Sequence, residues 1–253
     1  LTFEATGYAS VTSSSITIEK APLTVTAGDQ TVAFGTAAAT VTGAGTVTYS
    51  GFVNSETSSV VSGTVSYSTT YTSTTNAGTA GVTITPNVSG LSATNYSIAA
   101  ANGTITVTKA SQSALTVTST SGTYGTAVTL TTSGGTTGGL VTYTLGGSPT
   151  ASGCSISGTS LTSTSAGTCI VTATMAGSSN YNAVSSSATT VTLAKVNLTM
   201  SGVTAANKEY DGNNSATLSF AAASLNGVVS GDSSSDISFS SASATGTFTS
   251  TAV

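Results

Sequence analysis

Short runs in which apolar and hydroxyl-bearing residues alternate constrain the fold of this chain more than any other feature. Residues 103–108 read Gly-Thr-Ile-Thr-Val-Thr, and residues 115–118 read Leu-Thr-Val-Thr. Alternation with a period of two is typical of a β-strand that buries one face and exposes the other. No stretch longer than two turns combines the apolar spacing and the caps of a helix. We therefore predict an all-β fold.

A disordered chain is the main rival to this prediction, because 45 Ser and 55 Thr stand among 253 residues and only 5% of the residues are charged. Ser- and Gly-rich chains are often unstructured, since they bury too little apolar surface. Here 38% of the residues are hydrophobic, and they recur at strand spacing. We expect a folded protein whose surface is hydrated by hydroxyl groups rather than by charges.

The side-chain inventory excludes several classes of function. Binding to nucleic acid needs clustered Lys and Arg, whereas this chain has four scattered lysines and no arginine. It has no His, which is the commonest general base and transition-metal ligand. No apolar run approaches the roughly 20 residues of a membrane helix, and residues 1–10 do not resemble a signal peptide. We predict no enzyme activity, catalytic residue, cofactor, metal site or nucleic-acid partner, and no membrane span in this segment.

One phrase that contains a lysine occurs three times: Lys20-Ala-Pro-Leu-Thr-Val25, Lys109-Ala-Ser-Gln-Ser-Ala-Leu-Thr-Val117 and Lys195-Val-Asn-Leu-Thr-Met200. The lysines are 89 and 86 residues apart. Such a period indicates tandem modules, with each phrase at the junction between a last strand and the next first strand. The predicted division is residues 1–20 as closing strands of a preceding module, 21–109 and 110–195 as complete modules, and 196–253 as the first part of another.

A second landmark follows the same register. Asn95-Tyr96 begins 14 residues before Lys109, and Asn180-Tyr181 begins 15 residues before Lys195. A Tyr at this place commonly anchors the turn into the closing strands, as in the tyrosine corner of immunoglobulin-like sandwiches. We predict that Tyr96 and Tyr181 are structural turn anchors.

Five phrases between Lys20 and Lys109 carry a family resemblance for residues 21–109. They are Lys20-Ala-Pro-Leu-Thr-Val25, Val32-Ala-Phe-Gly35, Ser50-Gly-Phe-Val-Asn-Ser-Glu-Thr57, Ser92-Ala-Thr-Asn-Tyr-Ser97 and the turn Asn102-Gly103-Thr104. In these phrases the segment resembles the MBG domain of bacterial surface adhesins. Phe34 departs from that pattern, since a Tyr is usual there.

The following segments resemble two further families. Gly122-Thr-Tyr-Gly125, Gly153-Cys-Ser-Ile-Ser157, Ser165-Ala-Gly-Thr-Cys169 and Ala176-Gly-Ser-Ser-Asn-Tyr181 make residues 110–195 similar to a bacterial Ig-like repeat. Asn207-Lys-Glu-Tyr-Asp-Gly-Asn-Asn-Ser215 resembles the opening of a YDG domain, whose second half residues 196–253 lack. These families commonly neighbour one another in long secreted bacterial proteins. The resemblance implies a location outside the cell or on the bacterial cell surface, and a role in adhesion or as a scaffold. Together with the tandem period, it leads us to expect β-sandwich modules in an elongated array.

Cys154 and Cys169 are the two cysteines of the chain. Strand-like residues lie at either end of the segment between them, with a Gly-Thr-Ser turn in its middle. Two cysteines within a hairpin or meander of a secreted β module are expected to form a disulfide. Two free thiols are the alternative.

The acidic residues suggest at most one binding site. Glu209, Asp211, Asp232 and Asp236 fall within the last 45 residues. Calcium would need several such oxygens, but their spacing fits no calcium loop, and Asp211-Gly212 is typical of a turn. Calcium binding therefore stays a minor alternative. The other acids are isolated, which disfavours a catalytic carboxylate pair: Glu4, Glu19, Asp29 and Glu56.

These observations favour a structural role. We expect an extracellular stalk, fibre or matrix component of a large bacterial surface protein, which acts by spacing, adhesion or head-to-tail assembly. The alternative is an adhesin module that itself binds a glycan or protein ligand. The expected partners are neighbouring modules of the same long chain or identical subunits.

The two incomplete ends lead to a further expectation. An open sandwich exposes an apolar cleft and an unpaired strand edge. Either a longer chain or strands from a neighbouring subunit would cover them, and the second arrangement would propagate a filament. In both cases residues 1–20 should be paired as strands.

Overall fold

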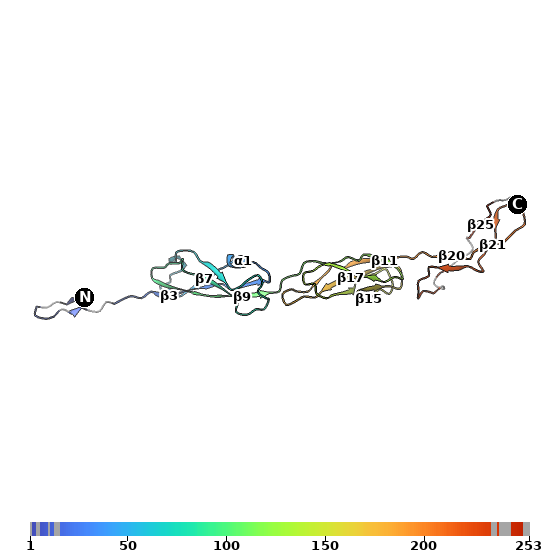
Figure 1. The fold of residues 1–253 in the computed structure, drawn as a ribbon. Coiled ribbons are helices and arrows are strands. Elements are labelled where there is room, and N and C mark those ends of the chain that lie inside the picture. Colours follow the sequence, from blue (N-terminus) through green and yellow to red (C-terminus); the bar gives the residue numbers. More distant parts are fainter. Residues whose placement is uncertain are drawn as a thin grey trace. The chain divides into compact units, whose positions relative to one another are not determined.

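The computed structural model describes residues 2–3, 6–9, 11–12, 16–233, 237 and 244–249 (Figure 1). The chain divides into two compact units. The first unit is Leu1–Ser111 together with Ser179–Asn182, and the second is Gln112–Ser178 together with Ala183–Val253. Each unit is described by itself.

The first unit consists of strands and two short helical segments. Its strands are β1 (Thr2–Phe3), β2 (Val11–Thr12), β3 (Ala21–Ala27), β4 (Gln30–Ala33), β5 (Val47–Ser50), β6 (Ser66–Thr69), β7 (Thr83–Asn87), β8 (Tyr96–Ala101) and β9 (Gly103–Thr108). The helical segments are α1 (Ala38–Gly43) and the 3-10 turn η1 (Ser58–Val60). β1 pairs with β2, whereas residues 16–20 form no strand.

Two sheets make up the sandwich of the first unit. One has the order β5-β3-β8, and the other has the order β4-β9-β7-β6. β3 pairs with β8 in parallel, and β4 pairs with β9 in parallel. Between β3 and β4, the chain therefore crosses from the first sheet to the second. Between β8 and β9 it makes the same crossing, and the two crossings run next to each other.

This double crossing depends on close backbone approach. A Cβ atom at Gly103 would lie 2.5 Å from the Ala27 carbonyl oxygen and 2.7 Å from that of Gly28. The Thr104 N–H donates a hydrogen bond of 2.6 Å to Oδ1 of Asp29. The isolated acid at position 29 thus joins the two crossings at a point where their backbones approach closely.

The alternation in sequence is reproduced by burial in the core of the first unit. On β3, Leu23, Val25 and Ala27 are buried, and on β9 Ile105 and Val107 are buried. Each strand places these side chains on one face, because successive Cβ atoms point to opposite sides of a sheet. Tyr71 is also buried, and its hydroxyl donates to the Thr36 carbonyl at 3.0 Å.

The second unit begins with a sandwich around one apolar core. Its strands are β10 (Leu115–Val117), β11 (Ser121–Thr123), β12 (Val128–Thr129), β13 (Thr132–Gly134), β14 (Val141–Leu145), β15 (Ser155–Ser157), β16 (Ser160–Thr162), β17 (Gly167–Met175), β18 (Val184–Ser185) and β19 (Thr189–Ala194). The largest sheet has the order β11-β19-β17-β14, with β18 on β17, and faces the sheet β12-β16-β15 and the pair β10-β13. β11 and β19 pair in parallel.

From residue 196 onward the strands pair only in short ladders. They are β20 (Thr199–Ser201), β21 (Thr204–Ala205), β22 (Ser215–Ala216), β23 (Leu218–Ser219), β24 (Ser224–Asn226) and β25 (Gly246–Thr247). β20 pairs with β24, β21 with β23, and β22 with β25. None of the described residues in this part is buried.

The predicted fold class is confirmed, since the structure is almost entirely β and forms sandwiches. Among the described residues, no helix is long and apolar enough to cross a membrane. The module boundaries stay predictions. The strand pairing expected throughout residues 1–20 is wrong for residues 16–20, where the chain is exposed and pairs with no strand, and β1 and β2 are the described strands of this segment.

Candidate functional site

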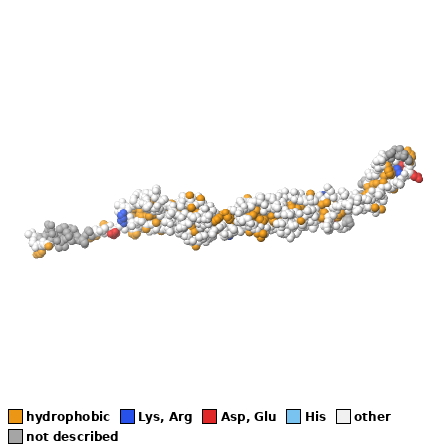
Figure 2. Space-filling model, viewed as in Figure 1, with side chains coloured by type: hydrophobic (Ala, Val, Ile, Leu, Met, Phe, Trp, Pro, Cys, Tyr) orange, Lys and Arg blue, Asp and Glu red, His pale blue; other side chains and the backbone are white. Residues whose placement is uncertain are grey.

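Charged side chains are few on the face of the molecule that Figure 2 shows, and most of that face is drawn white, as backbone and uncharged polar side chains. Exposed Ser and Thr side chains bind one another between neighbouring strands and loops, at oxygen-to-oxygen distances of 2.7–2.9 Å. The pairs are Ser62–Ser92, Thr116–Ser133, Thr118–Thr131, Thr150–Thr168 and Thr174–Ser185. Such cross-strand pairs stabilise a sheet while leaving its surface neutral and hydrated. Within the described part of the chain, this surface offers neither a basic patch nor an array of acids.

The structure joins the two cysteines in a disulfide that connects two sheets. Cys169 lies on β17 and is fully buried, and Cys154 immediately precedes β15. Their Cα atoms are 6.0 Å apart. The sequence suggested a hairpin or meander, but the hairpin β15-β16 lies between the cysteines and belongs to the opposite sheet. The bond therefore ties the two layers of the core together.

Tyr96 lies at the start of β8 and points into the first unit. Its hydroxyl accepts a hydrogen bond of 3.1 Å from the Val53 N–H and donates one to the Glu56 carboxylate. Its ring packs edge-on against Phe52, with 5.6 Å between ring centroids. Tyr96 thus contacts the loop that contains Val53 and Glu56, which is compatible with the predicted anchoring role. The hydrogen bond to Glu56 raises the pKa of Tyr96.

Replacing Glu56 by Gln should lower the pKa of Tyr96, because the hydrogen bond that the Tyr96 hydroxyl donates to this carboxylate is the main cause of the raised value. Folded Tyr96 holds its proton more tightly than unfolded Tyr96. The contribution of protonated Tyr96 to the stability of the fold should therefore be complete below the ordinary tyrosine pKa of about 10. It should be lost as the pH rises through the raised pKa of the folded protein. A titration that follows phenolate absorbance, with Tyr96→Phe to assign the transition, measures the shift. An unchanged curve in Glu56→Gln would contradict the assignment.

Tyr181 has different surroundings from Tyr96. Its ring lies edge-on against Phe34, with ring centroids 5.6 Å apart. The backbone of Tyr181 forms a parallel β-bridge with Ala110. In the same way, the backbone of Tyr96 pairs in parallel with Ala21 at the start of β3. The backbone positions of the two tyrosines correspond, but their rings contact different partners.

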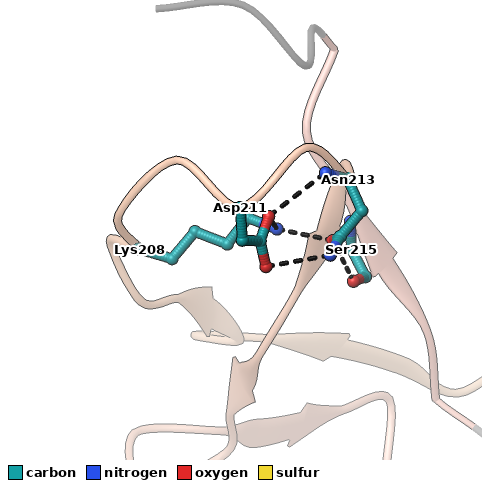
Figure 3. A network of polar contacts seen from close by, with 4 residues as sticks. All are labelled: Lys208, Asp211, Asn213 and Ser215. Atoms are coloured by element: carbon teal, nitrogen blue, oxygen red, sulfur yellow. Dashed lines mark hydrogen bonds and ion pairs between the residues drawn. The ribbon is translucent and has the colours of Figure 1, made fainter.

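The YDG-like phrase forms a polar network around Asp211 (Figure 3). Lys208 Nζ donates to Asp211 Oδ1 at 2.8 Å and to Asn213 Oδ1 at 2.6 Å. Asn213 returns two hydrogen bonds to the Asp211 carboxylate and accepts two from Ser215. The bond from Lys208 is the main cause of the lowered pKa of Asp211. The groups in this network bind one another, so the network is suited to shaping a loop rather than to holding a ligand.

The described acids do not converge on a metal site. Among residues whose positions the structure describes, no three His, Cys, Asp or Glu side chains lie together. Asp211 is paired with Lys208, and Asp232 accepts a hydrogen bond of 2.5 Å from the Tyr124 hydroxyl. Glu4 and Asp236 lie outside the described residues.

Two glutamines hold the backbone in ways that the sequence analysis missed. Gln112 is buried, and its Oε1 accepts from the N–H groups of Thr136 and Thr137 while its Nε2 donates to the Ala176 carbonyl. Gln30 Nε2 donates to the Val41 carbonyl at 3.1 Å. The one sequence feature that could have pointed to these residues is that glutamine is rare here. Gln30 and Gln112 are the two glutamines in a chain rich in short hydroxyl side chains.

Comparison with known protein families gives two matches. Residues 23–106 match the MBG domain (YGX type), and residues 192–253 match the YDG domain. The corresponding predicted resemblances are confirmed. Both are non-catalytic domains of surface-associated repeat proteins. No curated protein and no solved structure matches the chain. The Ig-like resemblance of residues 110–195 stays a prediction.

Proposed function

We propose that this chain, which carries an MBG domain and a YDG domain, is a force-transmitting part of a bacterial surface protein. It would serve as a stalk, fibre or matrix component, acting by spacing, adhesion or head-to-tail assembly. The families of the two domains support a surface location. The disulfide supports an oxidising, extracellular compartment.

The observation that carries the proposal is the parallel pairing of early and late strands in both sandwiches. In the first unit, β3 and β4 pair in parallel with β8 and β9. Tension on the chain pulls the start of β3 and the end of β9 in opposite directions along the strand axis. The hydrogen bonds between β4 and β9 are then sheared together rather than opened one at a time.

The second unit repeats this geometry. β11 pairs in parallel with β19 over three residue pairs, from Ser121–Thr192 to Thr123–Ala194. β19 in turn pairs with β17, which carries the disulfide to the opposite sheet. Tension between β11 and β19 therefore shears the hydrogen bonds that join them. The neighbouring strand β17 is held by the disulfide to the opposite sheet.

Pulling the chain by its two ends tests this function. The two sandwiches should unfold in separate events at higher force than a marker domain whose terminal strands pair antiparallel. Reduction should lengthen only the event of the second unit, by about 50 Å, because the 15-residue separation of the cysteines is released at roughly 3.5 Å per residue. Unfolding of both units before the marker would contradict a mechanical role.

Ligand binding remains the alternative, and its support would be a cluster of exposed aromatic side chains. Among the described residues, the strongly exposed aromatic side chains are Tyr8 and Tyr210, which stand in different units. The paired aromatic rings instead lie within contacts of the fold. Saturable binding of the whole chain to an immobilised glycan or matrix protein would favour the alternative.

A further inference from the structure

Two turns with the same geometry lie at corresponding places in the two units. In the first, Thr36 N–H donates to the Ala33 carbonyl at 3.2 Å, and Gly35 has φ +87°. In the second, Thr126 N–H donates to the Thr123 carbonyl at 3.1 Å, and Gly125 has φ +81°. A positive φ at the third position is typical of a type II turn, and glycine accepts it without strain. We call residues 33–36 and 123–126 the aromatic-glycine turns, after Phe34-Gly35 and Tyr124-Gly125.

Each aromatic-glycine turn is fastened to the last strand of its sandwich. Phe34 N–H donates to the Thr108 carbonyl at the end of β9, at 2.9 Å. Tyr124 N–H donates to the Ala194 carbonyl at the end of β19, also at 2.9 Å. Both aromatic side chains are only partly buried and belong to none of the core clusters. The turns therefore present an aromatic ring beside the point where the chain leaves the sandwich.

The first aromatic-glycine turn binds a segment from 147 positions farther along the chain, counted from Phe34 to Tyr181. The two rings meet edge-on at 5.6 Å. Next to them, the Ala77 N–H donates to Asn180 Oδ1 at 2.9 Å, and Asn180 Nδ2 donates to Asn76 Oδ1 at 2.8 Å. Ser179–Asn182 belongs to the first unit, and the aromatic pair and two directed hydrogen bonds are contacts that hold it there.

The same segment also holds the chain just after Lys109. Ala110 N–H donates to the Asn180 carbonyl at 2.9 Å, and Asn182 N–H donates to the Ala110 carbonyl at 3.0 Å. The residues on both sides of Ser179–Asn182 belong to the second unit. The segment therefore belongs to the first unit, although it is continuous along the chain with residues of the second.

The second aromatic-glycine turn has comparable contacts with residues that follow it. The Tyr124 hydroxyl donates to Asp232 Oδ1 at 2.5 Å. A Cβ atom at Gly125 would come within 2.5 Å of Val229 Cγ1, so this backbone lies directly against that side chain. Residues 229–232 stand beyond Lys195, as Tyr181 stands beyond Lys109.

We propose that the aromatic-glycine turns are binding sites for loops of the following module, and that this binding keeps the chain closed around the lysine that precedes that module. The ligand in each case is a short segment of the same chain that offers an aromatic, amide or carboxylate group. The chain around Lys109 or Lys195 can open only when these contacts are broken. This binding does not depend on the mechanical function proposed above.

Limited digestion of the oxidised full-length chain with trypsin tests the proposal, since the chain has lysine at only four positions and no arginine. Cleavage after Lys109 requires local opening of the residues around it, and its rate follows the population of the open state. Phe34→Ala or Tyr181→Ala should raise this rate about fivefold, as expected for the loss of one edge-on aromatic pair. The double variant should be no faster than the faster single variant, because both substitutions remove the same contact.

The other lysines provide the controls. Cleavage after Lys20 should not change in these variants, because Ala21 is held by Asn95 and Tyr96 instead. Tyr124→Ala should accelerate cleavage after Lys195 and leave Lys109 unaffected, whereas Tyr210→Ala removes an exposed ring and should change neither. Equal acceleration at Lys20 and Lys109 would indicate general destabilisation and overturn the proposal, as would unchanged cleavage at Lys109 in Phe34→Ala.

Discussion

Replacing Gly103 by Val should destabilise the first unit by about 3 kcal/mol, which corresponds to a fall in melting temperature of roughly 12–24 °C. Gly103 is buried at the start of β9, just after the chain crosses from β8 into the other sheet. Its added Cβ would lie 2.5 Å from the Ala27 carbonyl oxygen and 2.7 Å from that of Gly28. These are backbone atoms, so neither can move aside without separating the parallel pair β4-β9 or the hydrogen bond between Asp29 and Thr104. Thermal unfolding of the whole chain measures the effect.

A matched glycine provides the control for this experiment. Gly43 ends α1, and a Cβ atom there would meet nothing within 4 Å. Gly43→Ala should leave the stability unchanged or raise it by up to about 1 kcal/mol, because alanine reduces the freedom of the unfolded chain. The transition of the second unit serves as an internal reference. Equal stability of the Gly103→Val and Gly43→Ala proteins would show that the double crossing is not formed as described.

Loss of the Cys154–Cys169 disulfide should cost the second unit about 3 kcal/mol, the value expected when a cross-link closes a loop of about 15 residues. The bond joins β17 to the sheet that contains β15 and β16, so its removal frees the two layers of a single core. The Cys154→Ala/Cys169→Ala double variant should therefore melt at a lower temperature in the second unit and at an unchanged temperature in the first.

Reduction of the native chain is the complementary measurement. A reducing agent should reproduce the lowered melting temperature of the double variant, and it should have no effect on the variant itself. Mass spectrometry of unreduced peptides would identify the Cys154–Cys169 cross-link directly. Two alkylatable thiols in protein prepared from an oxidising compartment would instead support the free-thiol alternative.

The alternating pattern was sufficient to predict which side chains the strands bury. Ile105 and Val107 on β9, and Leu115 and Val117 on β10, are buried as their spacing required. The reason is local: in an extended chain, neighbouring side chains point to opposite faces, so the sequence itself sorts them. Phrases such as Val32-Ala-Phe-Gly35 and Asn207-Lys-Glu-Tyr-Asp-Gly212 likewise pointed to the two families that the comparison found.

The partner of each strand was decided only by the tertiary structure. Many segments share the same Thr-x-Thr alternation, so no local signal says that β4 lies in parallel beside β9, whose paired residues are 75 positions away. Asp29 looked isolated for the same reason, because Thr104, which it binds, is equally distant along the chain. The cross-sheet path of the disulfide and the contact between Phe34 and Tyr181 also depend on this packing. The local alternation of the sequence determines which side chains are buried. The pairing of strands depends instead on which segments, distant in sequence, pack around the same core.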